Sequence, residues 1–121
     1  MQHKAKGRKF GRVRKQRKAL FKTLIGSFIM REKITTTEAK AKELAPLTDK
    51  IINMAKKTKN GKGNKVVIAR ELQKRIPAMA AKKMSDNFLE RFEKRNSGYT
   101  RIIKIARRKS DGARMAVIEF V

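Results

Sequence analysis

The sequence contains no cysteine and no tryptophan, and His3 is its single histidine. Without cysteine the chain cannot form a disulfide, a thiolate zinc site or a cysteine nucleophile. His3 lies in a segment that we expect to be unfolded alone, where a general base cannot be held in geometry. The nearest carboxylate pair, Glu90 and Glu93, is typical of ion pairs on a helix surface. We therefore expect no catalytic residue, no metal, no cofactor and no small-molecule substrate.

Acidic residues are scarce as well. The chain has 34 Lys or Arg against 10 Asp or Glu, which gives a formal net charge of +24 at pH 7. The first 23 residues carry ten basic residues and no carboxylate, so this segment has no local counter-charge. Such a distribution is the electrostatic footprint of a protein that binds nucleic acid.

Long apolar runs are also absent. No run approaches the 18 or so residues that a membrane-spanning helix needs, and the N-terminus lacks the apolar stretch of a secretory signal. We expect a cytoplasmic protein without a membrane partner.

The N-terminal segment differs from the rest of the chain. Residues 1–11 contain two glycines and almost nothing apolar, so we expect an arm that becomes ordered on its ligand. We divide the chain into residues 1–20, a basic RNA-binding arm and helix start, and residues 21–121, a single α+β globular domain.

Hydrophobic periodicity predicts several helices. Apolar residues from Leu20 to Ile29 recur at steps of three and four, which indicates an amphipathic helix that begins near Arg12. A second helix is expected at residues 38–57, either kinked or split in two at Pro46. The third helix, residues 66–76, has four residues that we expect to face inward, and residues 78–84 and 86–94 are also helical in pattern. Those inward residues are Val66, Ala69, Leu72 and Ile76.

Two regions predict strands. Ile34–Thr37 is β-branched and suits a short edge strand, after which Thr37 caps the second helix. Two β-rich runs around Asp111-Gly112 predict a C-terminal hairpin. The fold class is therefore α+β, with a helical body, a small C-terminal antiparallel β-sheet and a basic N-terminal extension.

Five motifs in order carry a family likeness. They are M-x-H-x-x-x-G-R-x-x-G-R at residues 1–12, Gly26-Ser27, I-T-T-T-x-A-K-A-K-E-L at 34–44, G-Y-T-R-I at 98–102 and M-A-x-I-E at 115–119. This set resembles the bacterial large-ribosomal-subunit protein family L-seventeen over nearly the whole chain. The resemblance implies a structural constituent of the ribosome, in the cytoplasm, that binds large-subunit ribosomal RNA near the exit of the nascent-peptide tunnel, beside neighbouring large-subunit proteins.

Candidate contacts follow from this charge distribution. Arginine is favoured over lysine in the extension, because its guanidinium can hold a phosphate bidentately and stack on a base. Tyr99, the sole tyrosine, is a candidate for stacking on a base, although an aromatic residue at the start of a strand is more often packed in the core. The candidate RNA-binding residues are Lys4, Lys6, Arg8, Lys9, Arg12, Arg14, Lys15, Arg17, Lys18 and Lys22 in the extension, and Lys40, Lys42, Tyr99, Arg101, Lys104, Arg107 and Arg108 in the body.

Two other functions are compatible with the charge. A nucleoid-type DNA-binding protein would show a groove-reading helix or apolar wedges, and no clear recognition helix is visible in the sequence. A cationic membrane-surface protein would need a helix with basic residues opposite large apolar ones, which residues 12–30 meet loosely but without tryptophan.

Overall fold

The computed structural model describes residues 8–59, 61, 64–84 and 87–121. Its elements are α1 (Arg14–Arg31), β1 (Lys33–Thr37), α2 (Glu38–Lys59), α3 (Lys65–Arg75), α4 (Ala78–Met84), the 3-10 helix η1 (Asn87–Phe92), β2 (Thr100–Ile105) and β3 (Met115–Phe120). The expected α+β class is confirmed. The candidates Lys4 and Lys6 lie in residues 1–7, outside the described residues. Most of the arm, residues 1–11, lies there too, so its ordering on RNA stays a prediction.

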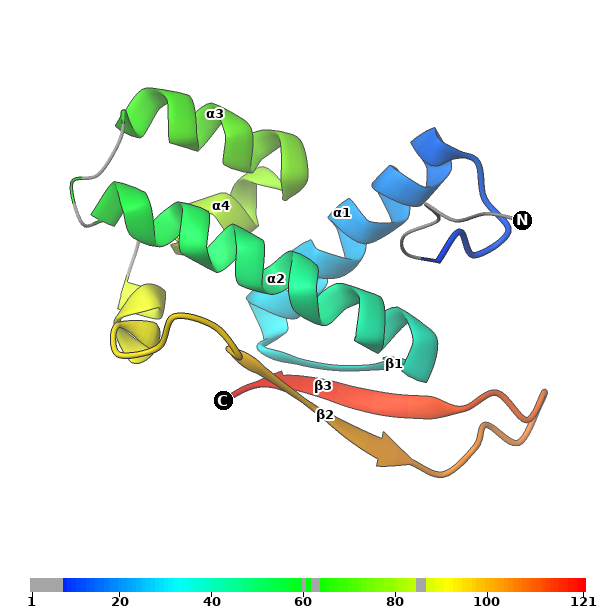
Figure 1. Cartoon of the computed structure of the whole chain (residues 1–121). Helices are drawn as coiled ribbons and strands as arrows, with labels where there is room; N and C mark the ends of the chain where they lie inside the picture. Colours follow the sequence, from blue (N-terminus) through cyan, green and yellow to red (C-terminus); the bar gives the residue numbers. More distant parts are fainter. Residues whose placement is uncertain (1–7, 60, 62–63, 85–86) are drawn as a thin grey trace, which may run out of the picture.

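The sheet has three strands in the order β1-β3-β2, and both pairings are antiparallel. The hairpin of β2 and β3 is confirmed, and the predicted edge strand β1 joins it by pairing Thr35 with Val117. The last strand in the chain is therefore the middle strand of the sheet. Helices α1 and α2 cover one face of the sheet, and α3 lies beyond α2 (Figure 1).

The core lies between the sheet and the helices that cover it. The rings of Phe28 on α1 and Phe120 on β3 stack at a centroid distance of 4.2 Å. Phe88 and Phe92 pack edge-on or tilted against Phe120, and Tyr99 packs edge-on against Phe92. These rings join α1, η1, β3 and the residue just before β2, so one aromatic cluster holds together segments far apart in the sequence.

Helix α2 continues through Pro46 as a single element, so the alternative of two abutting helices is wrong. Pro46 is exposed, whereas Leu44 and Ile51 on either side of it are buried in the same core. Burial of both halves offsets the backbone hydrogen bond that the proline cannot donate. The helix begins as expected, since Thr37 Oγ1 accepts from the backbone N–H of Lys40 at 3.4 Å.

The inward face of α3 differs from the predicted one. Leu72 and Ile76 are buried as expected, but Val66 is 57% exposed and Ala69 is also exposed. Ile68, four residues before Leu72, packs against the core instead. Val66 lies about 200° around the helix from Ile68, so the two cannot share a face.

Candidate nucleic-acid interface

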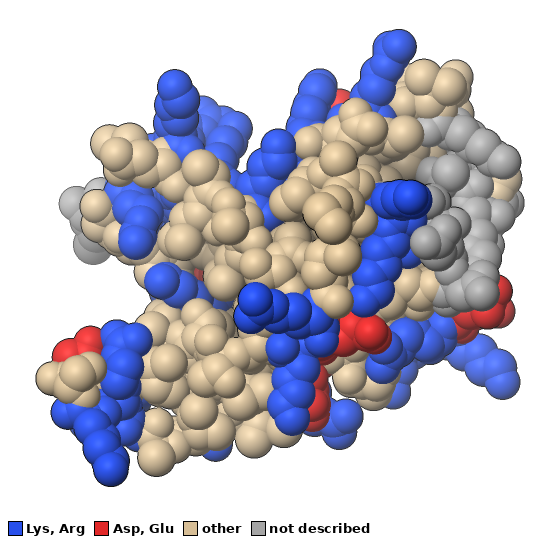
Figure 2. Space-filling model, turned by 180° about the vertical axis from the view of Figure 1, so that it is seen from behind, with Lys and Arg blue, Asp and Glu red and all other residues tan. Residues whose placement is uncertain are grey.

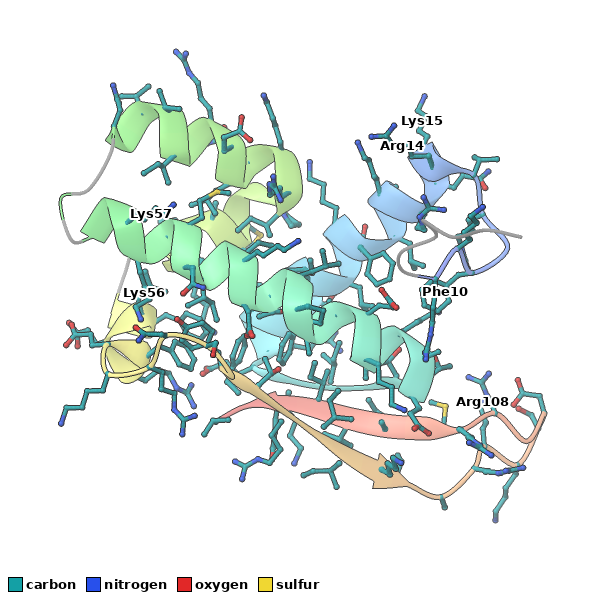
Figure 3. All side chains as sticks on the ribbon, in the orientation of Figure 1. Phe10, Arg14, Lys15, Lys56, Lys57 and Arg108 are labelled. Carbon is teal, nitrogen blue, oxygen red and sulfur yellow. The ribbon has the colours of Figure 1, made fainter. Side chains whose placement is uncertain are left out.

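The start of α1 is a concentration of positive charge without a local cap. Its first turn contains no acidic residue, and the N-cap residue Val13 offers no side-chain acceptor to the free N–H groups. Arg14 and Lys15 stand at this end of the helix, away from the sheet (Figure 3). The positive end of the helix dipole and these cations repel one another, and a bound anion relieves both.

This end of α1 is joined rigidly to the body. Helix α1 runs unbroken from Arg14 to Arg31, across the expected division at residue 20. Upstream, the ring of Phe10 packs on that of Phe21 at 5.6 Å, and Arg12 donates to the carbonyl of Phe10 at 2.8 Å. The basic half of the helix is therefore held in a fixed direction by the apolar half, in which Ile25, Phe28 and Ile29 are buried.

A hollow of about 540 Å³ lies between α1, α2 and α3. From behind, the surface is indented at the upper edge of the molecule, between Lys and Arg side chains on both sides (Figure 2). Its apolar part comes from α1 and α2, and its charged part comes from all three helices and the segment before α1. The lining residues are Arg8, Arg14, Arg17, Lys18, Phe21, Lys22, Ile25, Glu43, Leu47, Ile51, Glu71, Lys74 and Arg75.

The charge of this lining is unbalanced, with seven cations and two carboxylates. Glu43 lies 3.9 Å from Arg8, and Glu71 lies 3.2 Å from Lys74, so each carboxylate has one cationic partner. The other five cations have no carboxylate of the described residues within 4 Å. These five, Arg14, Arg17, Lys18, Lys22 and Arg75, are called the open cations below.

The candidates on the hairpin are in a different electrostatic state, because three of them already face carboxylates. Arg101 lies 3.1 Å from Glu119 across the strand pair. Arg108 donates to the two carboxylate oxygens of Asp111 from Nε at 2.9 Å and from Nη2 at 2.7 Å. These side chains have a competing anion at hand before any RNA arrives.

Glu38 gathers two further candidates. Its carboxylate lies 2.9 Å from Lys42 Nζ, one turn along α2, and 3.5 Å from Lys104 Nζ on β2. The hydrogen bond from Lys42, with smaller contributions from the charges of both lysines, lowers the pKa of Glu38 below its ordinary value. Lys40 is half-buried and lies on another face of the helix from the exposed Lys42.

Asp111 shapes the hairpin turn. The paired guanidinium of Arg108, and then the backbone N–H of Ala113 at 3.1 Å, lower the pKa of Asp111 to about 2. The carboxylate therefore stays ionised at neutral pH and keeps Arg108 on the turn, where Figure 3 shows it beyond the end of the strands.

The proposed stacking of Tyr99 on a base is contradicted. The side chain is fully buried, so neither face of the ring is available to a nucleotide. Its hydroxyl hydrogen-bonds to Asn53, donates to the carbonyl of Arg95 at 3.1 Å and accepts from Lys56 Nζ at 3.3 Å. The other alternative is confirmed: Tyr99 is an aromatic residue packed in the core next to the start of a strand.

Two cations that the sequence pattern did not predict as contacts lie beside the N-terminal set. Lys74 and Arg75 are in the last turn of α3, yet they line the same hollow as Arg14 and Lys18. Their spacing from α1 in the sequence gave no signal for this. No sequence pattern predicted the role of Lys56. Its ammonium donates to the carbonyl oxygens of Phe92 and Arg95, so this lysine stabilises the fold.

Two other features are absent from the described residues. These residues contain no group of three or more His, Asp or Glu side chains placed to hold a metal ion. Among their helices, none is both long enough and apolar enough to cross a membrane.

Comparison with known families gives one clear match. The family model described as "Ribosomal protein L17" matches residues 20–121. That range covers the folded body and most of α1, and it begins after nine of the ten basic residues of the N-terminal segment.

Individual relatives extend the similarity to the N-terminus. The "Large ribosomal subunit protein bL17" of Zymomonas mobilis subsp. mobilis is 45% identical over 121 residues, which is 100% of this chain and 83% of the relative. The protein of the same name from Hydrogenobaculum sp. is 40% identical over 122 residues, with 100% and 99% covered. That of Caldanaerobacter subterraneus subsp. tengcongensis is 40% identical over 114 residues, with 94% and 97% covered.

Proposed function

Because the chain belongs to the ribosomal protein L17 family, we propose that it is a structural component of the large ribosomal subunit that binds the ribosomal RNA of that subunit. The protein acts by neutralising phosphates and filling a space between folded RNA segments. It requires no cofactor, and its other partners are neighbouring large-subunit proteins.

The open cations support this proposal most directly. Four of them lie on one face of α1, at positions 14, 17, 18 and 22, and Arg75 faces them from α3. Holding five positive charges together without counter-charge is unfavourable, because the repulsion is strongest within a Debye length of about 8 Å. A polyanion removes this repulsion on binding, and RNA supplies phosphates at the required density.

Folded RNA fits the surface better than duplex DNA does. The exposed basic half of α1 faces α3 across the hollow, and α2 is packed on the sheet, so the open cations do not all lie on one isolated helix that could enter a major groove by itself. The cations border a concave space instead, which matches an irregular RNA surface recognised by shape.

Two elements of the proposal rest on the family resemblance alone. One is the position near the exit of the nascent-peptide tunnel, and the other is the identity of the protein neighbours. A cryo-EM map of the large subunit containing this chain checks both, and density for the chain elsewhere on the subunit would refute the position.

Binding is tested by measuring the affinity of the full chain for deproteinised large-subunit ribosomal RNA as a function of salt. Contact of the ten extension cations with ten phosphates gives a log-log slope of about −7 to −9. Duplex DNA at equal phosphate concentration serves as the competitor. If it displaces the RNA, the nucleoid-type alternative is favoured and the proposed function fails.

A further inference from the structure

We propose that the hollow between α1, α2 and α3 receives one unpaired nucleotide of the RNA, with its base against the apolar floor and its phosphates on the open cations. This inference rests on the proposed function and adds a specific subsite to it. The occupant is a base turned out of its helix, since a base within a continuous stack does not expose its face.

The three helices converge on this site with one face each. Residues 14, 17, 18, 21, 22 and 25 of α1 are spaced as neighbours on one side of a helix, as are 43, 47 and 51 of α2 and 71, 74 and 75 of α3. The space is therefore formed by rigid elements and exists before the ligand binds. Its volume of about 540 Å³ is within the range of small-ligand sites.

The floor of the hollow is apolar in a part of the molecule that is otherwise strongly charged. Ile25 and Ile51 are buried at its base, and Phe21 and Leu47 are half-buried at its side. Phe21 contacts Phe10 at an interplanar angle of 59°, so Phe10 covers the ring obliquely and not by stacking flat on it. An aromatic and aliphatic floor suits the flat face of a base.

The rim of the hollow carries the cations that would bind the phosphates of the nucleotide. Arg14, Arg17 and Lys18 border the space from α1, and Arg75 borders it from the opposite side on α3. A nucleotide within an RNA chain has a planar base, whose faces stack on apolar side chains, and an anionic phosphate on each side of its sugar. The apolar floor between two cationic walls matches both properties at once.

A phosphate alone does not explain the arrangement. Phosphodiester groups would satisfy the cations but leave the apolar floor in contact with water. A hydrophobic peptide would cover the floor but leave five cations without counter-charge. An unpaired nucleotide satisfies both parts of the site.

The test uses the full chain and deproteinised large-subunit ribosomal RNA. The variant Phe21→Leu keeps the floor apolar and the charge unchanged but removes the aromatic face. We expect its affinity for the RNA to fall by about tenfold, as for loss of one stacked base, with the salt slope unchanged. Phe88→Leu, in the aromatic core outside the hollow, is the matched control and should bind as the wild type does.

The outcomes are distinguishable from failure of the proposed function. If the wild type binds the RNA with steep salt dependence but Phe21→Leu binds equally well, the subsite is refuted and RNA binding stands. If the wild type does not bind, the proposed function itself fails.

A second measurement needs no variant and does not depend on how the variant folds. The wild-type chain is bound to RNA that contains 4-thiouridine and is irradiated, and the crosslinked peptides are identified. A crosslink within residues 21–25 or 47–51 supports the subsite. Crosslinks confined to other parts of the chain, or protection of this floor by a neighbouring protein in the assembled subunit, would overturn it.

Discussion

Gly26 is buried in α1 at the point where this helix crosses Pro77. A Cβ atom at position 26 would lie 2.5 Å from Cγ and 2.7 Å from Cδ of the proline ring. The ring is rigid, so the contact cannot be relieved by a rotamer change. A glycine in mid-helix, normally unfavourable, is here the residue that allows α1 to approach the start of α4.

Replacing Gly26 by alanine tests this contact. Alanine gains about 1 kcal/mol of helix propensity over glycine, but the clash costs typically 1–3 kcal/mol, so we expect a net loss of stability. Chemical denaturation measures it. Because the two sites are in contact, the double variant Gly26→Ala, Pro77→Ala should lose less than the sum of the single variants. Additive losses would show that the proline is not the cause.

Lys56 and Lys57 are adjacent on α2 (Figure 3). Lys56 is half-buried and Lys57 is exposed, so comparing variants of the two separates a lysine that stabilises the fold from one that only carries charge. Lys56 donates to two backbone carbonyls and to Tyr99, and its ammonium lies 5.2 Å from the ring centroid. Lys56→Met leaves these acceptors unpaired and should lower the free energy of unfolding by about 1–3 kcal/mol. The exposed Lys57→Met should change it by less than about 0.5 kcal/mol. Equal effects in thermal or chemical denaturation would contradict the structural role of Lys56.

At the scale of elements, the hairpin turn is organised by Asp111. The N–H of Gly112 donates to the carbonyl of Arg108 at 2.8 Å, and Gly112 adopts a φ of +69°, which favours glycine. The ionised carboxylate then fixes both the Arg108 side chain and the backbone of Ala113.

The pH dependence of this turn follows from the direction in which the pKa of Asp111 is shifted. The pKa is lowered from 3.8 to about 2 in the folded protein. The ionised carboxylate therefore stabilises the folded state fully above about pH 4, and this stabilisation is lost as the pH falls toward 2. We expect the NMR titration of its carboxyl carbon to have a midpoint near 2, and Arg108→Ala to move that midpoint upward. A midpoint near 3.8 in the wild type would exclude the ion pair.

Local sequence signals predicted most of the elements correctly. Apolar spacing located α1 and α2, and β-branched residues located β1 and the hairpin. The errors arose where tertiary packing decides. Pro46 does not break α2, because both halves are buried in one core, and Val66 is exposed because α3 is rotated to place Ile68 inward.

At the scale of the whole molecule, the cations divide into open ones and ones that already have a carboxylate. We predict that replacing Arg14, Arg17, Lys18 and Lys22 by alanine weakens RNA binding strongly and flattens the salt dependence by a slope of about 3 to 4. Alanine favours helix, so α1 should still form.

The control for this variant removes the same charge from exposed positions outside the hollow. These positions are Arg31, Lys57, Lys94 and Arg114. Binding isotherms at several salt concentrations compare the two proteins. Equal losses of affinity with equal slopes would mean that RNA responds to net charge alone, and the proposed interface would be wrong.

The sequence predicted the basic segment of this interface but not its partners in space. Ten cations without a carboxylate are visible in the first 23 residues. Arg75 joins them only because α3 packs back across α2, and Tyr99 leaves the set only because its ring is enclosed by the core. Both facts depend on long-range contacts that no local pattern encodes.

The order of strands in the sheet has a consequence for how the protein is made. The strand β3 lies between β1 and β2, so β1 has no hydrogen-bonding partner until residues 115–120 have been synthesised. Helices α1 and α2 precede β3 in the chain and can form earlier, but the sheet that they cover, with Phe120 against Phe28, cannot be completed before β3 is available. A growing chain of this protein therefore exposes the apolar faces of these helices until β3 has been synthesised and can pair with β1 and β2.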